Sequence, residues 1–463
     1  MAPKFGTSGL RGLVTELTPD LIAAHTRAFL AACPVGTGLF VGRDLRDSSP
    51  RLVADVIAAA HAQGVDVTDC GALPTPALAL AALWAGAAAV MVTGSHIPAN
   101  RNGLKFYTPA GEITKLEEAA ILRALDAPHT PARIQGLLTA RDAAPAYAAR
   151  YLTAFGPTAL AGLHIGVWSH SAVGRDGLIE ILRALGAEVT EIGRSETFVP
   201  VDTEAVPPDA RALLREAIAA HGLDAIVSTD GDGDRPLLAD GSGQIVPGDV
   251  LGQITAQALG AQVVVTPVSS NTGVDHFGFA QVIRTRIGSP YVIAGMGQHA
   301  DARVVGYEAN GGFLLGFDAQ GPAGPLPRLM TRDSLLPILA PLVMAGTDGI
   351  AALVARGPQR FTASDRLQDV PTDRSADLVA RLTTDSAART QFLAALGAGA
   401  ATGQDLTDGL RLTLATGRIL HLRPSGNAPE LRFYTEAETQ THADTLLRRG
   451  LEVLAKMLDT QFR

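Results

Sequence analysis

Three segments of the chain carry the same succession of patterns, and this recurrence constrains the fold more than any other feature of the sequence. Each begins with an apolar run of strand length, continues through a polar turn into an amphipathic helix, and ends at a glycine before the next strand. The segments cover residues 38–67, 164–189 and, more weakly, 263–282, where the helix is expected over 273–282. Strand–helix–strand units of this length join parallel strands, so the pattern predicts three related α/β domains.

The C-terminal part of the chain follows a different pattern. Short apolar runs at 410–414, 418–422 and 431–435 predict strands without crossover helices, and 441–458 has the periodicity of a closing amphipathic helix. The sequence therefore predicts three α/β domains with mixed, mainly parallel sheets, followed by an α+β domain. Polar or proline-bearing joints place these domains at residues 1–140, 145–243, 247–355 and 362–463. A chain of 463 residues is long enough for them at roughly 100–200 residues each.

Composition excludes several classes of protein. Hydrophobic residues make up 47% of the chain, which excludes intrinsic disorder as the dominant state. A net charge of −8 argues against a protein that binds nucleic acid by neutralising phosphates. Two cysteines cannot build a disulfide framework, and no Cys/His spacing suggests zinc. The longest apolar stretch, 77–92, is too short to span a bilayer and no secretory signal opens the sequence, so we expect a cytoplasmic protein without membrane or nucleic-acid partners.

The most specific motif is Ser228-Thr-Asp-Gly-Asp-Gly-Asp-Arg-Pro236, which directly follows a strand-like run at 224–227. Alternate aspartates on a glycine-rich loop can direct three carboxylates, those of Asp230, Asp232 and Asp234, toward one hard cation such as Mg²⁺. An EF-hand is excluded, because its turn glycine would fall on Arg235 and its closing glutamate on Gly241. An Asp-x-Asp phosphatase motif also fails, since Asp234 stands where its Thr or Val would be. A solvated acidic turn is the remaining alternative, although one arginine does not compensate three carboxylates.

A second motif begins where the buried strand predicted at 87–92 ends, which is the usual place for a site in an open α/β sheet. In it, Ser95 is a candidate nucleophile or phosphoryl carrier, His96 a hydrogen-bonding neighbour, and Lys105 an acid/base or a phosphate clamp. A Ser–His triad pair is not expected, because neighbouring side chains diverge on an extended backbone. A polar connector without a catalytic role is the alternative interpretation.

A third motif lies between two predicted strands near the C-terminus. Arg423 and Arg432 bracket Ser425, Gly426 and Asn427. Exposed backbone N–H groups of a glycine-bearing loop, together with arginines, form a cradle for phosphate. A polar hairpin turn is the alternative.

Two weaker motifs complete the set. In Gly306-Tyr-Glu-Ala-Asn-Gly-Gly312, the carboxylate of Glu308 and the amide of Asn310 suit paired sugar hydroxyls. In Phe5-Gly-Thr-Ser-Gly-Leu-Arg-Gly12, Arg11 could reach an anion. Taken alone, each also fits an ordinary loop.

Together and in this order, the five motifs resemble the α-D-phosphohexomutase family, which contains the phosphoglucomutase and phosphomannomutase enzymes, over residues 6–432. The resemblance implies four domains around a central cleft, each giving one loop. It also implies an isomerase that interconverts hexose 6-phosphate and hexose 1-phosphate through a phosphoserine and a hexose 1,6-bisphosphate, which serves as activator. Mg²⁺ would be the cofactor, a small hexose phosphate the only partner, and the protein a monomer or homodimer.

The resemblance further implies a role for each matching residue. Ser95 matches the phosphoryl carrier, and a phosphoserine oxygen completes the metal shell formed by the three aspartates of the acidic motif. The other matches are Arg11, His96, Lys105 and Arg235 around the reacting phosphate, Glu308 and Asn310 for the sugar, and Arg423, Ser425, Gly426, Asn427 and Arg432 for the non-reacting phosphate. Lys105 is the favoured acid/base.

Two loops depart from the family pattern. Gly94 and Ile97 replace the Ala and Asn of Ala-Ser-His-Asn-Pro, while Asn310 and Gly312 replace the Ser and His of Gly-Glu-x-Ser-Gly-His. The resulting Glu-Ala-Asn-Gly-Gly form resembles the phosphomannomutase branch and differs from phosphoglucosamine mutases. A phosphoglucomutase or phosphoglucosamine mutase is the alternative. A non-catalytic sugar-phosphate-binding protein is more remote, because Ser95 and the three aspartates are all present.

Overall fold

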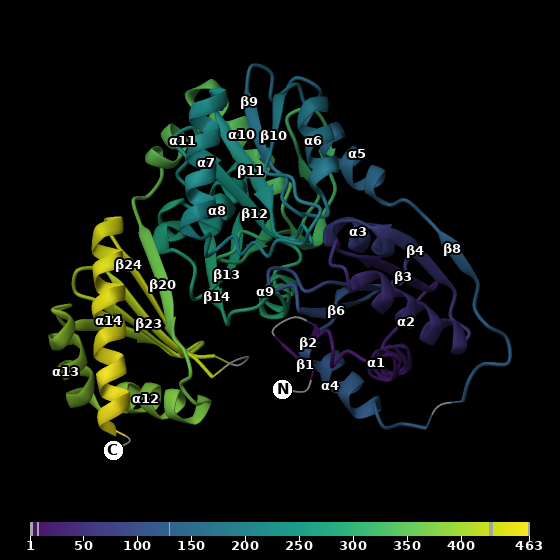
Figure 1. The fold of residues 1–463 in the computed structure, drawn as a ribbon. Coiled ribbons are helices and arrows are strands. Elements are labelled where there is room, and N and C mark those ends of the chain that lie inside the picture. The colour runs from purple at the N-terminus through teal and green to yellow at the C-terminus, as the bar shows by residue number, and fades with distance from the viewer. Residues whose placement is uncertain (1–2, 7–8, 129, 426–428, 462–463) are drawn as a thin grey trace.

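The structure is a computed structural model that describes residues 3–6, 9–128, 130–425 and 429–461. Figure 1 shows the C-terminal domain, in yellow and light green, beside a larger body formed by the rest of the chain. Helices cover mixed sheets in the larger body, whereas the C-terminal sheet is antiparallel. The predicted fold class, three α/β domains followed by an α+β domain, is therefore confirmed.

The first domain is built on a sheet in the order β1-β2-β6-β5-β3-β4-β8, with β7 paired to β6. The strands are β1 (Lys4–Phe5), β2 (Leu10–Leu13), β3 (Leu39–Arg43), β4 (Val67–Ala72), β5 (Ala88–Val92), β6 (Arg101–Thr108), β7 (Gly111–Glu112) and β8 (Leu138–Ala140). The helices are α1 (Pro19–Ala32), α2 (Ser49–Ala62), α3 (Thr75–Ala85) and α4 (Lys115–Ala124). As predicted, β3 and β4 are parallel across helix α2, and the apolar stretch 77–92 is a helix followed by a buried strand.

The second domain has the strand order β10-β9-β11-β12. It contains β9 (His164–Trp168), β10 (Glu188–Ile192), β11 (Ala225–Thr229), β12 (Pro236–Asp240), α5 (Ala144–Phe155), α6 (Arg175–Ala184) and α7 (Pro208–His221). Strands β10, β9 and β11 are parallel, while β12 returns antiparallel to β11. The acidic motif is therefore the turn of a hairpin at the end of a buried strand.

The third domain has the strand order β14-β13-β15-β16-β19. It contains α8 (Gly248–Ala258), β13 (Val263–Pro267), β14 (Gln281–Thr285), α9 (Ser289–Gly297), β15 (Val304–Tyr307), β16 (Phe313–Leu315), β17 (Ala319–Gln320), β18 (Pro325–Leu326), β19 (Leu329–Asp333), α10 (Leu336–Ala345) and α11 (Ile350–Arg356). The helix expected over 273–282 is wrong: a single 3₁₀ segment, Thr272–His276, connects the parallel strands β13 and β14. Gly273 and Gly278 disfavour a helix, and Gly278 has a positive φ of 77°.

The C-terminal domain is an antiparallel sheet in the order β20-β24-β23-β22-β21, covered by helices. Its elements are β20 (Phe361–Leu367), α12 (Thr372–Thr384), α13 (Ser386–Leu396), β21 (Ala401–Asp405), β22 (Leu410–Leu414), β23 (Ile419–Pro424), β24 (Leu431–Ala437) and α14 (Gln440–Gln461). Strand and helix predictions for this part are confirmed. The domain has its own hydrophobic cluster, whereas one larger cluster runs through the first three domains.

Two apolar helices lie inside the larger body. Nearly all of α3 is buried, because it packs against the sheet of its own domain on one side and against α5 and β19 on the other. Helix α10 is buried along most of its length as well. Among the described residues no single helix is long and apolar enough to cross a bilayer, and only the pair Leu336–Asp348 and Ile350–Arg356, bent by 99°, meets that length and composition together.

The packing of α14 on its sheet yields a stability prediction. A Cβ added at Gly450 would lie 2.0 Å from the Phe433 ring, whereas nothing lies within 4 Å of a Cβ at Gly177 in α6. Gly450→Ala should therefore destabilise the C-terminal domain by about 1–3 kcal/mol through overpacking. Gly177→Ala, the matched control, should be neutral or stabilising by up to about 1 kcal/mol. Thermal unfolding of both variants checks this, and equal midpoints would contradict it.

Candidate functional site

Three buried carboxylates form the centre of the site. Asp230, Asp232 and Asp234 lie in the β11–β12 turn, are each 0% exposed, and place one ligand oxygen apiece within 4.8 Å of one another. Gly233 has a φ of 74° and packs against Pro74 at the start of α3, so the turn requires a glycine there. We call these three aspartates the acidic cluster. The solvated acidic turn considered from the sequence is excluded by this burial.

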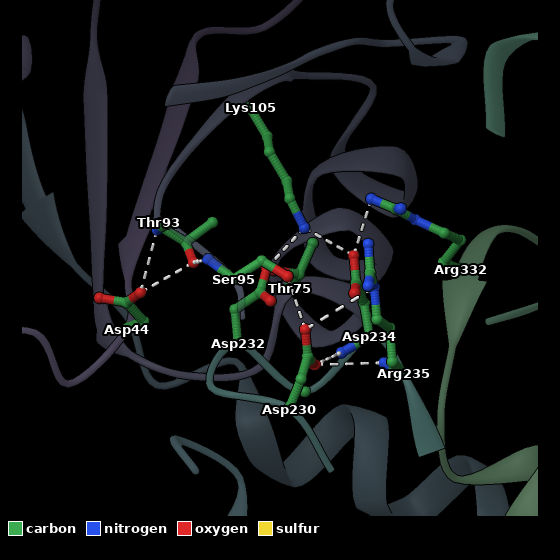
Figure 2. A network of polar contacts seen from close by, with 12 residues as sticks. Asp44, Thr75, Thr93, Ser95, Lys105, Asp230, Asp232, Asp234, Arg235 and Arg332 are labelled. Carbon is green, nitrogen blue, oxygen red and sulfur yellow. Dashed lines mark hydrogen bonds and ion pairs between the residues drawn. The ribbon is translucent and has the colours of Figure 1, made fainter. Parts of the chain in front are cut away.

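Cations from two other domains compensate the acidic cluster (Figure 2). Lys105 on β6 places its Nζ 2.5 Å from Asp232 Oδ2 and 2.6 Å from Asp234 Oδ2. Arg332 on β19 places its Nη2 2.8 Å from Asp234 Oδ2. Thr75 at the start of α3 adds a hydrogen bond of 2.7 Å from its hydroxyl to Asp232 Oδ2. The cluster thus depends on side chains that are far away in the sequence.

Burial and mutual repulsion divide the charge unequally within the acidic cluster. Burial, and then the negative charges of Asp232 and Asp234, raise the pKa of Asp230 well above its ordinary value. Burial also opposes ionisation of Asp232, but the charge and hydrogen bond of Lys105 outweigh it and lower the pKa of Asp232. A cation bound at the acidic cluster would therefore be stabilised by the carboxylates, because it offsets their mutual repulsion.

The acidic cluster fits a divalent cation. Oδ1 of Asp232 and Oδ1 of Asp234 are buried, and among the described residues neither accepts a hydrogen bond. Unpaired buried carboxylate oxygens are costly unless a cation meets them. Oxygen ligands at this spacing suit a hard ion such as Mg²⁺. The three aspartates are therefore the residues that could hold the metal.

Ser95 contacts the acidic cluster directly. Its hydroxyl donates a 2.6 Å hydrogen bond to Asp230 Oδ2, and the residue is 1% exposed. Its φ of 53° is left-handed, which is uncommon for a residue with a side chain. The backbone N–H of Ser95 donates to Thr93 Oγ1 at 2.8 Å, and that hydroxyl donates to Asp44 Oδ2 at 2.8 Å. These two consecutive hydrogen bonds hold Ser95 in its strained conformation.

Arg46 binds the backbone of the serine loop, residues 93–102. Its guanidinium donates to the backbone carbonyls of Ser95 (2.9 Å), Ile97 (2.6 Å), Pro98 (2.8 Å) and Arg101 (3.0 Å). Arg46 Cζ also lies over the Phe198 ring of the second domain, 3.9 Å from its centre.

Gly94 belongs to the same arrangement. A Cβ at this position would lie 2.6 Å from Arg46 Cζ. The replacement of the usual alanine by Gly94 thus leaves room for Arg46.

His96 is a neutral imidazole among cations. The positive charge of Arg235, then burial, then the charge of Arg11 hold the pKa of His96 far below its ordinary value. Its Nδ1 lies 3.3 Å from Ser95 Oγ. The expectation that these neighbouring side chains diverge is therefore wrong, because Ser95 is left-handed rather than extended.

Arg11 and Arg235 extend the positive ring around the acidic cluster. Arg11 lies on β2, and burial with the charges of Arg235 and Arg332 lowers its pKa to about 10, so it stays charged at neutral pH. Burial opposes the charge of Arg235 as well, but Asp230, Glu204 and Asp234 outweigh burial and raise its pKa. Positive side chains gathered next to a buried hydroxyl suit a phosphate group.

The loop at residues 306–312, called the sugar loop after its expected role, adjoins this ring through Arg332. Glu308 is 5% exposed and its Oε2 lies 3.3 Å from Arg332 Nη1. The side-chain oxygen of Asn310 accepts from the backbone N–H of Gly312 at 3.0 Å, so that atom closes its own loop. Glu308 is thus the loop residue whose carboxylate connects to the acidic cluster, through Arg332.

The C-terminal loop at 423–432, called the phosphate loop after its expected role, is described at residues 423–425 and 429–432. Arg423 and Arg432 face each other across β23 and β24, and their ion pairs among the described residues go to Asp408 (3.0 Å) and Glu430 (3.5 Å) of the same domain. Ser425 is buried, and its N–H donates to the carbonyl of Glu430 at 2.9 Å. Gly426 and Asn427 lie outside the described residues.

A cavity separates the C-terminal domain from the second and third domains. Its volume is about 580 Å³, and its lining includes Thr203, Gly248, Ala309, His421 and Tyr434. Ala309 belongs to the sugar loop, while His421 and Tyr434 lie on β23 and β24, the strands that carry the phosphate loop. Space for a small ligand therefore exists where the C-terminal sheet faces Ala309 of the sugar loop.

The structure adds residues that the sequence motifs did not reveal: Asp44, Arg46, Thr75, Thr93, Arg332 and Ser334. Ser334 donates from its hydroxyl to the carbonyl of Gly233 at 2.7 Å. For Asp44 and Arg46 a signal existed, because both follow a predicted strand within Gly42-Arg-Asp-Leu-Arg46. For Arg332, which lies 98 residues from Asp234, no local pattern indicated the contact.

Comparison with known proteins identifies the family. The chain matches the family models of the four phosphoglucomutase/phosphomannomutase domains in consecutive segments. These are α/β/α domain I at residues 2–131, domain II at 147–243, domain III at 247–361 and the C-terminal domain at 367–450. A phosphomannomutase of Sinorhizobium fredii is 45% identical over 471 residues, covering 98% of this chain and 99% of its own length. A phosphomannomutase of Salmonella muenchen is 42% identical over 462 residues, covering 98% and 96%.

A solved structure agrees in fold. A phosphoglucomutase/phosphomannomutase family protein from Burkholderia thailandensis superimposes with a TM-score of 0.78 at 22% identity, covering 98% of this chain and 97% of its own. Sequence and fold thus match over nearly the whole length, and the chain belongs to the phosphoglucomutase/phosphomannomutase family of isomerases.

Proposed function

We propose that the protein interconverts hexose 6-phosphate and hexose 1-phosphate through phosphorylated Ser95 and a hexose 1,6-bisphosphate. The observation that carries this proposal is the 2.6 Å contact of Ser95 Oγ with Asp230, inside a buried acidic cluster ringed by cations. A hydroxyl in these surroundings suits transfer of a highly charged phosphoryl group, since the cations can meet charge on its oxygens. The same surroundings argue against a protein that only binds sugar phosphates.

The proposed reaction consists of two phosphoryl transfers. First, the bond between phosphorus and Ser95 Oγ breaks as the free hydroxyl oxygen of the substrate bonds to that phosphorus, which gives the bisphosphate. The bisphosphate then turns round, and its other phosphoryl group returns to Ser95 Oγ. Lys105 Nζ is the proposed acceptor of the hydroxyl proton in the first step and returns it to the sugar oxygen released in the second step. To do so, Nζ must leave Asp232 or Asp234, its present partners.

The remaining groups bind and orient. Arg11 and Arg235 meet the charge of the transferring phosphoryl group, and neutral His96 offers a hydrogen bond to it. Mg²⁺, for which the acidic cluster supplies the ligands, would add a Lewis acid at the same phosphoryl group. Glu308 would bind sugar hydroxyls, and the phosphate loop would hold the other phosphate through Arg423 and Arg432.

Mannose phosphates are the proposed substrates. Two relatives named phosphomannomutase match over nearly the whole chain at 45% and 42% identity, and the Glu-Ala-Asn-Gly-Gly sugar loop supports the same branch. Turnover should be faster with mannose 1-phosphate than with glucose 1-phosphate, each assayed with its 1,6-bisphosphate as activator. A clear preference for glucose 1-phosphate or glucosamine 1-phosphate would identify another mutase, and no turnover of any of them would overturn the proposal.

Two variants separate sugar recognition from phosphate binding in the same assay. Glu308→Gln should lower kcat/KM by about tenfold and change the ratio between mannose and glucose substrates, because an amide cannot replace a carboxylate that accepts two hydroxyl donors. Arg423→Ala should raise KM for both by the same factor. Arg448→Ala on exposed α14 is the control. If Arg423→Ala changed the sugar preference instead, the two loops would not divide the work in this way.

The metal proposal has a direct test by calorimetry. Asp232→Asn should weaken Mg²⁺ binding by at least about tenfold, because it removes a charged ligand. Asp209→Asn makes the same change at an exposed position in the first turn of α7 and should leave Mg²⁺ affinity unchanged. Circular dichroism should show both variants folded, and chelation should stop turnover of the unmodified protein. Undiminished turnover in excess chelator would contradict a metal role.

A further inference from the structure

One buried arginine contacts the acidic cluster and the sugar loop at the same time. Arg332 lies near the end of β19 and is 5% exposed. Its Nη2 is 2.8 Å from Asp234 Oδ2, and its Nη1 is 3.3 Å from Glu308 Oε2. Figure 2 shows the guanidinium directed at Asp234. A single rigid group therefore joins a metal-ligand candidate of the second domain to the sugar-loop carboxylate of the third.

The sugar loop is shaped around this arginine. A Cβ at Gly312 would lie 3.1 Å from both Cγ and Cδ of Arg332, closer than ordinary van der Waals contact. Gly312 also donates its N–H to Asn310, so it is fixed in place. The glycine thus provides the path along which Arg332 reaches Glu308 and Asp234.

Arg332 donates a hydrogen bond from Nη1 to Glu308 Oε2 and is otherwise held by charge. Burial disfavours its positive charge, but Asp234, Glu112 and Glu308 outweigh burial and raise its pKa. Its Nη2 lies close to Asp234, yet among the described residues it donates no hydrogen bond. Asp234 Oδ2 is also shared with Lys105. Asp234 and Glu308, the two carboxylates within ion-pair distance of the guanidinium, therefore compete for one cation, and that balance responds to any charge added at the acidic cluster.

We propose that Arg332 is a positioning residue that couples the acidic cluster to the sugar loop. It opposes cation binding at Asp234, and it holds Glu308 for the hydroxyls of the sugar. Positive charge bound at the acidic cluster moves the balance of Arg332 toward Glu308 and the hexose phosphate, so each ligand strengthens binding of the other. The nature of the two ligands, Mg²⁺ and a hexose phosphate, rests on the proposed function.

Equilibrium binding tests this coupling without turnover. In calorimetry, Arg332→Gln should bind Mg²⁺ at least about threefold more tightly, because a competing charge is lost, and mannose 6-phosphate at least about threefold more weakly. Arg332→Lys should lie between, since an ammonium keeps the charge but cannot span both carboxylates. Arg328→Gln, the same change at an exposed position just before β19, should alter neither affinity. A merely structural role would instead weaken both ligands together.

A double-mutant cycle isolates the contact itself. Glu308→Gln should weaken Mg²⁺ binding in the unmodified protein, because Arg332 then pairs with Asp234 alone, and should have no such effect in Arg332→Gln. If Glu308→Gln changed Mg²⁺ affinity equally in both backgrounds, the proposal would be overturned. The same holds if Arg332→Gln weakened binding of Mg²⁺ and mannose 6-phosphate together, or changed neither affinity. If the Arg332 variants do not fold, Glu308→Gln decides alone, and an unchanged Mg²⁺ affinity overturns the proposal. A protein without mutase activity that showed this coupling would overturn only the proposed function.

Discussion

Three carboxylates gathered within 4.8 Å and removed from water impose a charge constraint on the whole molecule. Burying ionised groups is costly unless they are paired, and the β11–β12 turn supplies too little positive charge of its own. Lys105 arrives from the first domain and Arg332 from the third. The same turn is fixed by Thr75 of α3 and by Ser334 after β19. Compensation of one acidic turn therefore holds three domains in register.

The serine loop of the first domain also contacts the buried acidic cluster, through Ser95 and Asp230. Ser95 reaches Asp230 in a left-handed conformation, and Arg46 supports that conformation by binding the carbonyls of the loop. Phe198 of the second domain covers the guanidinium of Arg46. The Ser95 hydroxyl is thus positioned by both domains that meet at the acidic cluster. The C-terminal domain, by contrast, has a separate core and borders a cavity shared with the second and third domains.

The features that the sequence predicted correctly are those that depend on residues close together in the chain. The acidic motif, Ser95 and the strand–helix–strand units depend on neighbouring residues, and the structure brings Ser95, Lys105 and the three aspartates together. The helix over 273–282 failed because two glycines outweighed an apparent periodicity. Arg332 had no local signal because its contact with Asp234 joins distant parts of the chain, whereas Arg46 follows a predicted strand but gave no indication of its partners in the serine loop. Gly94 and Gly312 were visible only as departures from a family pattern, and the two arginines explain both.

Following the phosphoryl group itself gives the most direct measurement. Dephosphorylated protein is incubated with a hexose 1,6-bisphosphate that carries labelled phosphorus, and the modified peptide is then mapped by mass spectrometry, with Ser95→Ala as comparison and Ser386→Ala, at an exposed serine of α13, as control. One phosphoryl group should appear on the peptide that contains Ser95, should pass to added hexose monophosphate, and should be missing from Ser95→Ala alone. Label on another residue, or an equally labelled Ser95→Ala protein, would contradict a phosphoryl-transfer site built from Ser95 and the acidic cluster.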